Sequence, residues 1–323
     1  MKLNFFCCFY FIFNFGFTQT SNDDAVYLDS LHNIGTEDNF KYIRITKDYY
    51  TNNDTYLVSD FYKSGKLEMR GTTKDKNILK LDGTCIFYYE NGNKKQISNY
   101  ADSNLNGKQF EWYENGNIKS EKEILWDNKN FMSNVEIIHY WDENSIQKVI
   151  DGNGTYTEIK PEESSQGEIK NRLKQGKWTG TNIIDKYTYT ENYENGILID
   201  GVSIDSSKTE HTYKTIEYNG IPRKGMEAFY SYIGKNLRIP KEVSVNNITG
   251  KIYASFFVEK DGSIKDVTII RDIGYDTGKE VIRIIKNYKD WTPSTYRGIG
   301  IKKKYSLPIT ISSPKQYNLY PNY

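Results

Sequence analysis

Apolar and polar positions alternate most clearly in the last third of the chain. Residues 251–259 place an apolar side chain at every second position from Ile252 to Val258, which predicts a half-buried strand. Asp261-Gly262 follows and supplies the positive φ angles of a tight hairpin. Residues 264–271 are rich in β-branched side chains, so we expect them to form the return strand.

Register and position in the sheet can also be inferred. Ile264 and Val267 fall on opposite faces of the return strand, so a bulge is expected near Lys265. Residues 304–311 alternate again and predict a third strand. Pro308 lies within it and cannot donate to a ladder, so this strand is expected at an exposed edge of the sheet.

Two amphipathic helices are predicted beside these strands. One apolar face recurs at helical spacing: Val281, Ile284, Ile285 and Tyr288. Thr277 and Glu280 have the spacing of a capping box, so this helix is expected to open at about Gly278. A second apolar stripe covers residues 226–237 and stops at Pro240. The predicted order is helix, strand, strand, helix, strand.

Residues 225–311 resemble the C-terminal domain of TonB, the periplasmic part of an energy transducer that contacts outer-membrane receptors. Four motifs carry the resemblance: Arg238-Ile239-Pro240, the strand that begins at Gly250 with Asp261-Gly262 after it, Trp291-Thr292-Pro293, and Tyr305-Ser306-Leu307-Pro308-Ile309. The resemblance implies a small α-β-β-α-β domain over about a quarter of the chain.

The resemblance also implies a binding mode. In that family the last strand pairs with an extended peptide from the receptor, by strand addition at the sheet edge. Carried over, the partner-binding residues are Lys302, Lys303, Lys304, Tyr305, Ser306, Leu307 and Ile309. Lys302 and Lys304 would face acidic residues of the peptide. The alternative is that these lysines protect the edge from pairing.

Residues 56–201 repeat a pattern of two aromatics, two polar residues and glycine. The first copies end at Gly65, Gly92 and Gly116, which are 27 and 24 residues apart. Asn-Gly predicts type I′ turns, so each copy is expected to form a β-hairpin. Later copies drift: Tyr140-Trp141-Asp142-Glu143-Asn144 lacks the glycine, Gly176-Lys177-Trp178-Thr179-Gly180 keeps a core, and Tyr193-Glu194-Asn195-Gly196 restores the pattern.

These copies resemble MORN repeats in their bacterial variant. Because one hairpin cannot bury both faces, neighbours are expected to stack into an elongated single-layer sheet. Such an array serves as a partner surface or as a spacer. The predicted fold class is α+β, an all-β hairpin-repeat array followed by the small α-β-β-α-β domain.

Residues 1–18 have the pattern of a secretory signal peptide. The apolar run at residues 5–17 is thirteen residues long, short of the ~20 that span a bilayer. An uncleaved anchor is the alternative. The predicted organisation after residue 18 is an unassigned segment at 19–55, repeats at 56–220, the TonB-like domain at 225–311 and a tail at 312–323. After cleavage only Cys85 remains, which excludes an intramolecular disulfide.

Charge is unevenly distributed. Residues 225–311 contain 15 Lys/Arg and 9 Asp/Glu, a net charge of +6, whereas residues 19–224 carry about −7. This asymmetry favours acidic partners or association of the C-terminal domain with a membrane surface. An ordinary solvated surface is the alternative. No nucleic-acid partner is expected.

No catalytic, cofactor or metal site is predicted. The three histidines are scattered along the chain: His32, His139 and His211. None has the spacing of a zinc site. Asp151, Asn153, Thr155 and Glu162 match four positions of a calcium loop. Tyr156 stands where that loop needs glycine, so Asp151-Gly152 is read as a repeat turn. Cys85 has no neighbouring base to activate it.

Together these patterns predict a non-enzymatic protein of the periplasm or cell envelope, secreted across the inner membrane. Its partner would be an outer-membrane receptor peptide or another envelope protein, with a link to transmembrane transport. Two alternatives remain, an anchored TonB-type energy transducer and a structural or wall-binding repeat protein.

Overall fold

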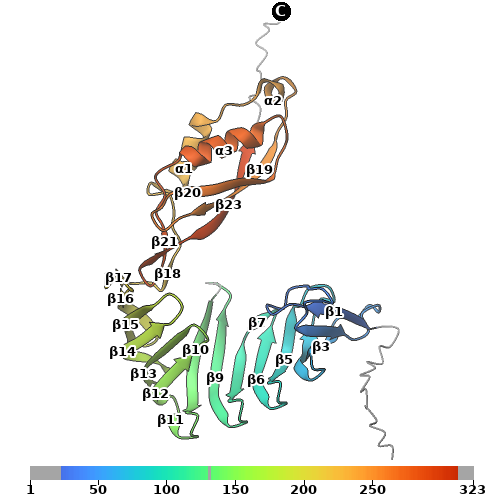
Figure 1. Cartoon of the computed structure of the whole chain (residues 1–323), viewed down its shortest axis with the longest axis vertical. Helices are drawn as coiled ribbons and strands as arrows, with labels where there is room; N and C mark the ends of the chain where they lie inside the picture. Colours follow the sequence, from blue (N-terminus) through green and yellow to red (C-terminus); the bar gives the residue numbers. More distant parts are fainter. Residues whose placement is uncertain (1–22, 130–131, 312–323) are drawn as a thin grey trace, which may run out of the picture. The chain divides into compact units, whose positions relative to one another are not determined.

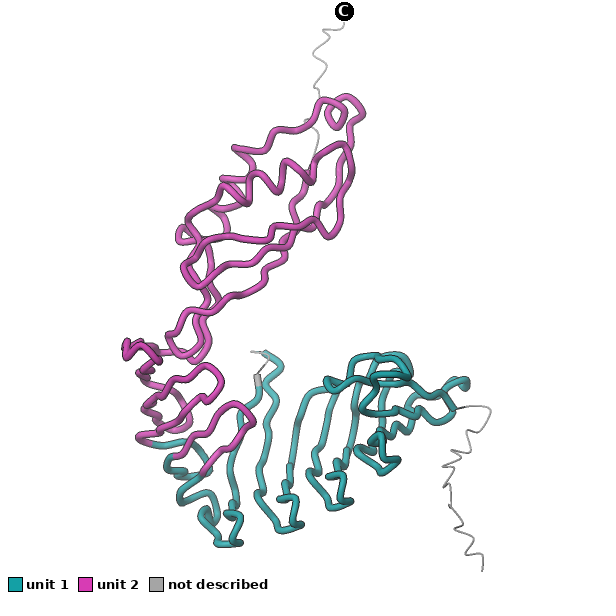
Figure 2. Tube along the Cα trace, in the orientation of Figure 1, with its two compact units in different colours: residues 1–156, 167–175 teal, residues 157–166, 176–323 magenta. Residues whose placement is uncertain are grey.

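The computed structural model describes residues 23–129 and 132–311. Contacts divide the chain into two compact units (Figure 2). Unit 1 holds residues 1–156 and 167–175, and unit 2 holds residues 157–166 and 176–323. The predicted signal peptide at 1–18 and the tail at 312–323 lie outside the described residues. Within the described ranges, no helix is long and apolar enough to cross a membrane.

A long antiparallel sheet follows the N-terminus (Figure 1). Its first twelve strands are β1 (Asp24–Leu28), β2 (Tyr42–Thr46), β3 (Tyr56–Tyr62), β4 (Leu67–Thr73), β5 (Leu81–Tyr88), β6 (Lys94–Ala101), β7 (Asn104–Leu105), β8 (Gly107–Trp112), β9 (Ile118–Asp127), β10 (Met132–Trp141), β11 (Gln147–Ile150) and β12 (Asn153–Ile159). Consecutive strands pair antiparallel, and β6 pairs with both β7 and β8. This sheet is the predicted hairpin array.

The turns of the first copies differ from the predicted type I′. The backbone N–H of Tyr89 donates to the carbonyl of Asn93 (2.8 Å), and that of Gly92 donates to the carbonyl of Tyr89 (2.9 Å). Gly92 has a φ of +94°, whereas the asparagine before it does not have a positive φ. This is a three-residue loop that ends in a left-handed glycine. The type I′ prediction is wrong here because a type I′ turn needs a positive φ at both central residues, and only the glycine has one.

The fourth copy also turns one residue later than the sequence pattern indicated. The N–H of Asp142 donates to the carbonyl of Ile146 (3.0 Å), and that of Ser145 donates to the carbonyl of Asp142 (2.9 Å). Ser145 has a φ of +61° and occupies the position that glycine holds in the earlier copies. Trp141 is therefore the counterpart of the first aromatic. The predicted alignment, which began at Tyr140, is wrong by one residue.

Tyrosine hydroxyls join successive copies within unit 1. The hydroxyl of Tyr62 donates to the carbonyl of Tyr88 (2.7 Å), and that of Tyr89 donates to the carbonyl of Trp112 (2.9 Å). Tyr113 repeats the contact with the carbonyl of Trp141 (2.8 Å). Burial raises the pKa of Tyr62 to about 12, so its hydroxyl stays a donor at neutral pH. We call these three bonds the tyrosine ladder.

The remaining elements complete unit 2 and its shared strands: β13 (Glu163–Lys170), β14 (Leu173–Asn182), β15 (Tyr187–Glu194), β16 (Ile197–Ile204), β17 (Glu210–Tyr213), β18 (Glu217–Tyr218), α1 (Gly225–Asn236), α2 (Lys241–Val245), β19 (Gly250–Val258), β20 (Ile264–Arg271), α3 (Thr277–Asn287), β21 (Ser294–Tyr296), β22 (Ile299–Ile301) and β23 (Lys303–Ile311). Two further sheets have the strand orders β18-β21-β22 and β20-β19-β23. Helix α2 and strands β21 and β22 were absent from the predicted order.

One apolar core holds the C-terminal elements together. Trp291 is 2% exposed, and its ring lies edge-on to those of Phe229 on α1 (5.3 Å), Phe256 on β19 (5.3 Å) and Tyr305 on β23 (5.2 Å). The apolar face of α3 packs against β19 and β20 (Figure 1). The helices and the sheet therefore form one packed body around the tryptophan.

The predicted bulge in the β19–β20 hairpin is confirmed. Ser255 pairs with Thr268, but Phe257 pairs with Lys265, so one extra residue lies on β20. Asp266 has a φ of +51° in this stretch. The apolar alternation changes face between Ile264 and Val267 because of this extra residue, since an inserted residue moves every later side chain to the other face.

The predicted capping box of α3 is wrong. The hydroxyl of Thr277 donates to Oδ1 of Asp272 (2.7 Å) and to the carbonyl of Gly274 (2.6 Å). Glu280 accepts the backbone N–H of Arg238 (2.9 Å) and pairs with Arg283. The carboxylate thus fastens α3 to the segment after α1. The two N–H groups that the box would satisfy have other acceptors, since that of Thr277 donates to the carbonyl of Gly274 (3.2 Å) and that of Glu280 to the carbonyl of Asp276 (3.3 Å).

Candidate strand-addition site

Strand β23 lies at an edge of its sheet, as predicted. It pairs with β19 from Gly250 opposite Ile311 to Val258 opposite Lys303, with no register shift. Among the described residues, no strand pairs with its other side. Nine residues of regular strand are therefore available for main-chain pairing on one flank.

Pro308 indicates which backbone groups face outward. A proline is accommodated in a ladder where its nitrogen points away from the neighbouring strand. In antiparallel pairing the direction of the backbone groups alternates from residue to residue. Every second residue from Pro308 has its backbone groups on the same side. The N–H and C=O groups of Lys304, Ser306 and Thr310 therefore also point away from β19. The open flank thus carries three complete donor and acceptor sets and one carbonyl without a donor.

The inward side chains of β23 hold the strand in place. Ile309 is buried, and Tyr305 and Leu307 are half-buried against the core. The hydroxyl of Tyr305 donates to the carbonyl of Gly220 (2.8 Å) and lies 2.7 Å from Oγ of Ser294. These three of the seven predicted residues support the edge rather than contact a ligand with their side chains.

The three predicted lysines differ in whether an acidic residue of the same chain already pairs with them. Nζ of Lys302 lies 2.7 Å from Oε1 of Glu259 and 3.4 Å from Oδ2 of Asp266, and the hydrogen bond to Glu259 raises its pKa. Nζ of Lys303 bonds to Glu217 and to an asparagine oxygen. Lys304 is exposed and makes no ion pair within the described ranges. Lys304 is therefore the cation that an acidic ligand would meet first.

The opposite edge of the same sheet is a poorer template. Strand β20 contains the bulge at Asp266, which interrupts its register against β19. Bulges twist an edge away from regular pairing. Strand β23 is thus the better of the two edges for an added strand.

Sequence reasoning missed a buried charge cluster in unit 2. Arg297 lies in the turn between β21 and β22 and is 5% exposed. Its Nε donates to Oε1 of Glu191 (2.7 Å), and its Nη1 donates to Oε2 of Glu163 (2.7 Å). The guanidinium lies 3.7 Å from the ring centroid of Tyr189. Burial alone would lower the pKa of Arg297, but its hydrogen bond to Glu191 and the negative charge of that residue raise it.

This Arg297 cluster joins the C-terminal hairpin to repeat strands β13 and β15 of the same unit. Glu191 is 1% exposed and also accepts the hydroxyls of Tyr193 and Tyr213, each at 2.9 Å. The two carboxylates lie 106 and 134 residues before Arg297, so no local spacing could have indicated the cluster.

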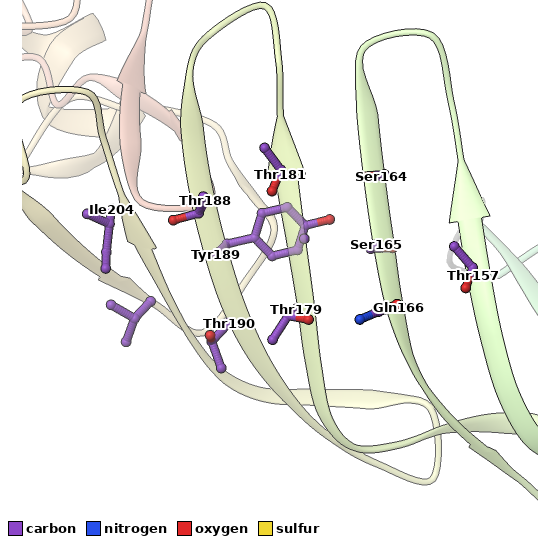
Figure 3. A pocket seen from close by; sticks show the side chains of 12 residues that line it. Thr157, Ser164, Ser165, Gln166, Thr179, Thr181, Thr188, Tyr189, Thr190 and Ile204 are labelled. Carbon is purple, nitrogen blue, oxygen red and sulfur yellow. The ribbon is translucent and has the colours of Figure 1, made fainter.

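A hollow of about 510 Å³ lies on the repeat face of unit 2. Hydroxyl and amide side chains line much of it, including Thr157, Ser165 and Thr179, and Figure 3 shows the ring of Tyr189 among them. Gly180 allows this arrangement, because a Cβ there would lie 2.2 Å from that ring. The repeat pattern gave no indication of the hollow.

Comparison with known families agrees with both predicted resemblances. Residues 235–310 match the family model for the Gram-negative bacterial TonB protein C-terminal. Residues 81–102 and 105–124 match the model for the MORN repeat variant. The chain thus combines MORN-variant repeats with a domain similar to the C-terminal domain of TonB, which suggests an envelope protein. No curated protein matches the chain.

Proposed function

We propose that this chain is a non-enzymatic adaptor of the periplasm or cell envelope. Its TonB-like domain binds an outer-membrane receptor peptide, or a segment of another envelope protein, by strand addition to β23. The observation that carries the proposal is the regular nine-residue edge formed by β23, inside the segment that matches the TonB model. Such binding would link the chain to transmembrane transport.

The edge accounts for both affinity and selectivity. An added strand gains main-chain hydrogen bonds, each with a net contribution of about 0.5–1.5 kcal/mol. Pro308 has no backbone N–H, so one carbonyl of the ligand strand remains hydrogen-bonded to water. The exposed charge of Lys304 next to the open groups favours a peptide with a carboxylate at the matching position.

Two alternatives lead to other measurements. An anchored transducer would retain residues 1–18, whereas a secreted adaptor would not. Mass spectrometry of the native N-terminus separates them, because a chain that starts at Gln19 excludes the anchor. A wall-binding repeat protein is favoured by the hydroxyl-lined hollow of unit 2, and it would lose ligand on substitution of Thr179 rather than of β23.

The direct test measures capture of fluorescent peptides from receptor N-termini by the full mature chain. Ser306→Pro removes an outward N–H while the ladder to β19 is kept, and we expect it to weaken capture about two- to tenfold, the value of one main-chain hydrogen bond. Lys304→Glu should weaken binding about two- to fivefold and reduce its salt dependence. Lys286→Glu is the control, because it makes the same charge change on the exposed face of α3.

The outcome that contradicts the proposal is equally specific. Capture that survives Ser306→Pro unchanged, in a variant whose circular dichroism matches the parent, would place the ligand away from β23. An equal loss with Lys304→Glu and Lys286→Glu would indicate general charge attraction and no edge pairing.

A further inference from the structure

One oxygen of a buried carboxylate in unit 1 has no hydrogen-bond partner among the described residues. Glu68 is 7% exposed, and its Oε2 has no hydrogen-bond partner among the described residues. Burying an ionised carboxylate is costly unless a cation or donors compensate it. A positively charged or coordinating neighbour would offset this cost for Glu68.

A β-bulge aims Glu68 inward. Asp60 pairs with Met69 and Phe61 pairs with Leu67, so Glu68 is the extra residue of β4. A bulge places two successive side chains on one face, and Glu68 and Met69 are both buried.

The same bulge recurs in the next copies with a different residue. Its equivalents are Lys95 on β6 and Lys119 on β9, each six residues after the tyrosine of the ladder. Their ammonium groups lie over the rings of Tyr89 and Tyr113, at 5.8 and 5.7 Å. The first copy thus carries a carboxylate where the next two copies carry a cation, so the repeat fold itself does not require the glutamate.

His32 faces this carboxylate from the loop between β1 and β2. Its Nε2 lies 3.6 Å from Oε2 of Glu68, and its ring stacks on Tyr42 at 4.2 Å and 14°. The backbone of His32 has a φ of +60°, in a turn where the N–H groups of Leu31 and Asn33 donate to Oδ1 of Asp29. The loop therefore holds the imidazole in place although it is partly exposed.

Asp60 completes the group. It lies opposite Arg44 in the β2–β3 pairing, and Arg44 binds both carboxylate oxygens, through Nε at 2.8 Å and Nη2 at 2.6 Å. Each oxygen keeps a second lone pair, so Asp60 can still donate to a metal. One donor atom from each of His32, Asp60 and Glu68 lies within 4.8 Å of the others.

We propose that His32, Asp60 and Glu68 bind a divalent transition-metal cation, with Zn²⁺ the best match. One imidazole and two carboxylates are a donor set that zinc accepts, with a fourth position left for water. Arg44 would orient Asp60 as an outer partner orients a metal ligand. A hollow of about 550 Å³ is lined by His32 and Arg44, so it reaches one of the three ligands and the partner of another. This site is independent of the β23 edge.

A plain ion pair between protonated His32 and Glu68 is the competing explanation. It needs no metal, so it predicts that the chain shows no saturable binding of Zn²⁺ at this group.

The test is calorimetric titration of the metal-free, untagged full mature chain with ZnCl₂ at pH 7.5. We expect saturable binding of one equivalent, with at least tenfold weaker affinity in both His32→Ala and Glu68→Gln. His139→Ala is the matched control, because His139 faces a single exposed carboxylate, that of Asp151, at 3.7 Å. Its affinity should equal that of the parent.

A second readout guards against misfolding of a variant. Zn²⁺ should raise the melting temperature of the parent and of His139→Ala but not that of His32→Ala, since a ligand stabilises only the state that binds it. Absence of saturable binding by the parent at micromolar Zn²⁺, or unchanged binding by His32→Ala, would overturn the proposal.

Discussion

At the scale of residues, the buried charges of the Arg297 cluster are tolerated because each of them has a partner of opposite charge. Arg297 is nearly inaccessible, yet two carboxylates, the hydroxyl of Tyr296 and the face of Tyr189 surround its guanidinium. A buried ion pair adds little beyond an apolar replacement, but removal of one member leaves the other uncompensated. Arg297 is thus important because Glu191 and Glu163 depend on it.

Replacing Arg297 therefore has a predictable cost. We expect Arg297→Met to lower the free energy of unfolding by about 3–5 kcal/mol in urea denaturation. Arg223→Met is the control, because Arg223 is 62% exposed and lies 3.5 Å from Asp290, and it should cost under about 1 kcal/mol. Similar losses in the two variants would mean that the Arg297 cluster does not stabilise the fold.

Single-residue roles at the candidate edge were only partly predictable. The alternation of residues 304–311 and the proline within them indicated an edge strand, because both are local properties. The engagement of Lys302 and Lys303 by acidic residues was not visible, since those partners come from other elements. The sequence therefore identified the strand, but it did not show that Lys304 is the lysine without an ion pair among the described residues.

At the scale of elements, the repeats stack through a bond that recurs with the sequence pattern. Each hydroxyl of the tyrosine ladder reaches a carbonyl of the following copy, 23 to 28 residues further along. The sequence indicated repeated hairpins because the aromatics recur. It did not show that one aromatic of each pair is a hydrogen-bond donor across copies.

We expect Tyr89→Phe to lower the free energy of unfolding by about 1 kcal/mol, the typical net value of one hydrogen bond. Tyr88→Phe is the control, since the hydroxyl of Tyr88 makes no hydrogen bond in the part of the chain that the structure describes, and it should cost much less. Thermal or urea unfolding of the full chain measures both. Equal effects would show that the ladder bond contributes no stability of its own.

At the scale of the whole molecule, charge is segregated along the chain. The segment at 225–311 carries +6, and exposed cations such as Lys251, Lys265 and Lys304 lie on its sheet strands. Oppositely charged surfaces attract such a segment over a distance that salt shortens, from ~30 Å at 0.01 M to ~10 Å at 0.1 M.

This asymmetry predicts salt-sensitive membrane association. We expect the full chain to co-sediment with vesicles that contain anionic lipid at low ionic strength, and to be released as salt approaches 0.2 M. Neutral vesicles are the control. Binding that is insensitive to salt, or equal on neutral vesicles, would argue against an electrostatic origin.

The sequence by itself determined the features that depend on neighbouring residues. These are the hairpin repeats, the strands of the C-terminal sheet, the bulge between Ile264 and Val267, and the edge position that Pro308 imposes. Side-chain periodicity and the missing N–H of proline act within a few residues, so they can be read along the chain.

Only the tertiary structure decided which distant side chains meet. It brought Arg297 to Glu163 and Glu191, fixed Lys302 against Glu259, and placed His32 beside the bulged Glu68. Such contacts depend on strand register and loop conformation across many residues, and a shift of one position would turn each side chain away. The charged sites of this protein are therefore products of its packing.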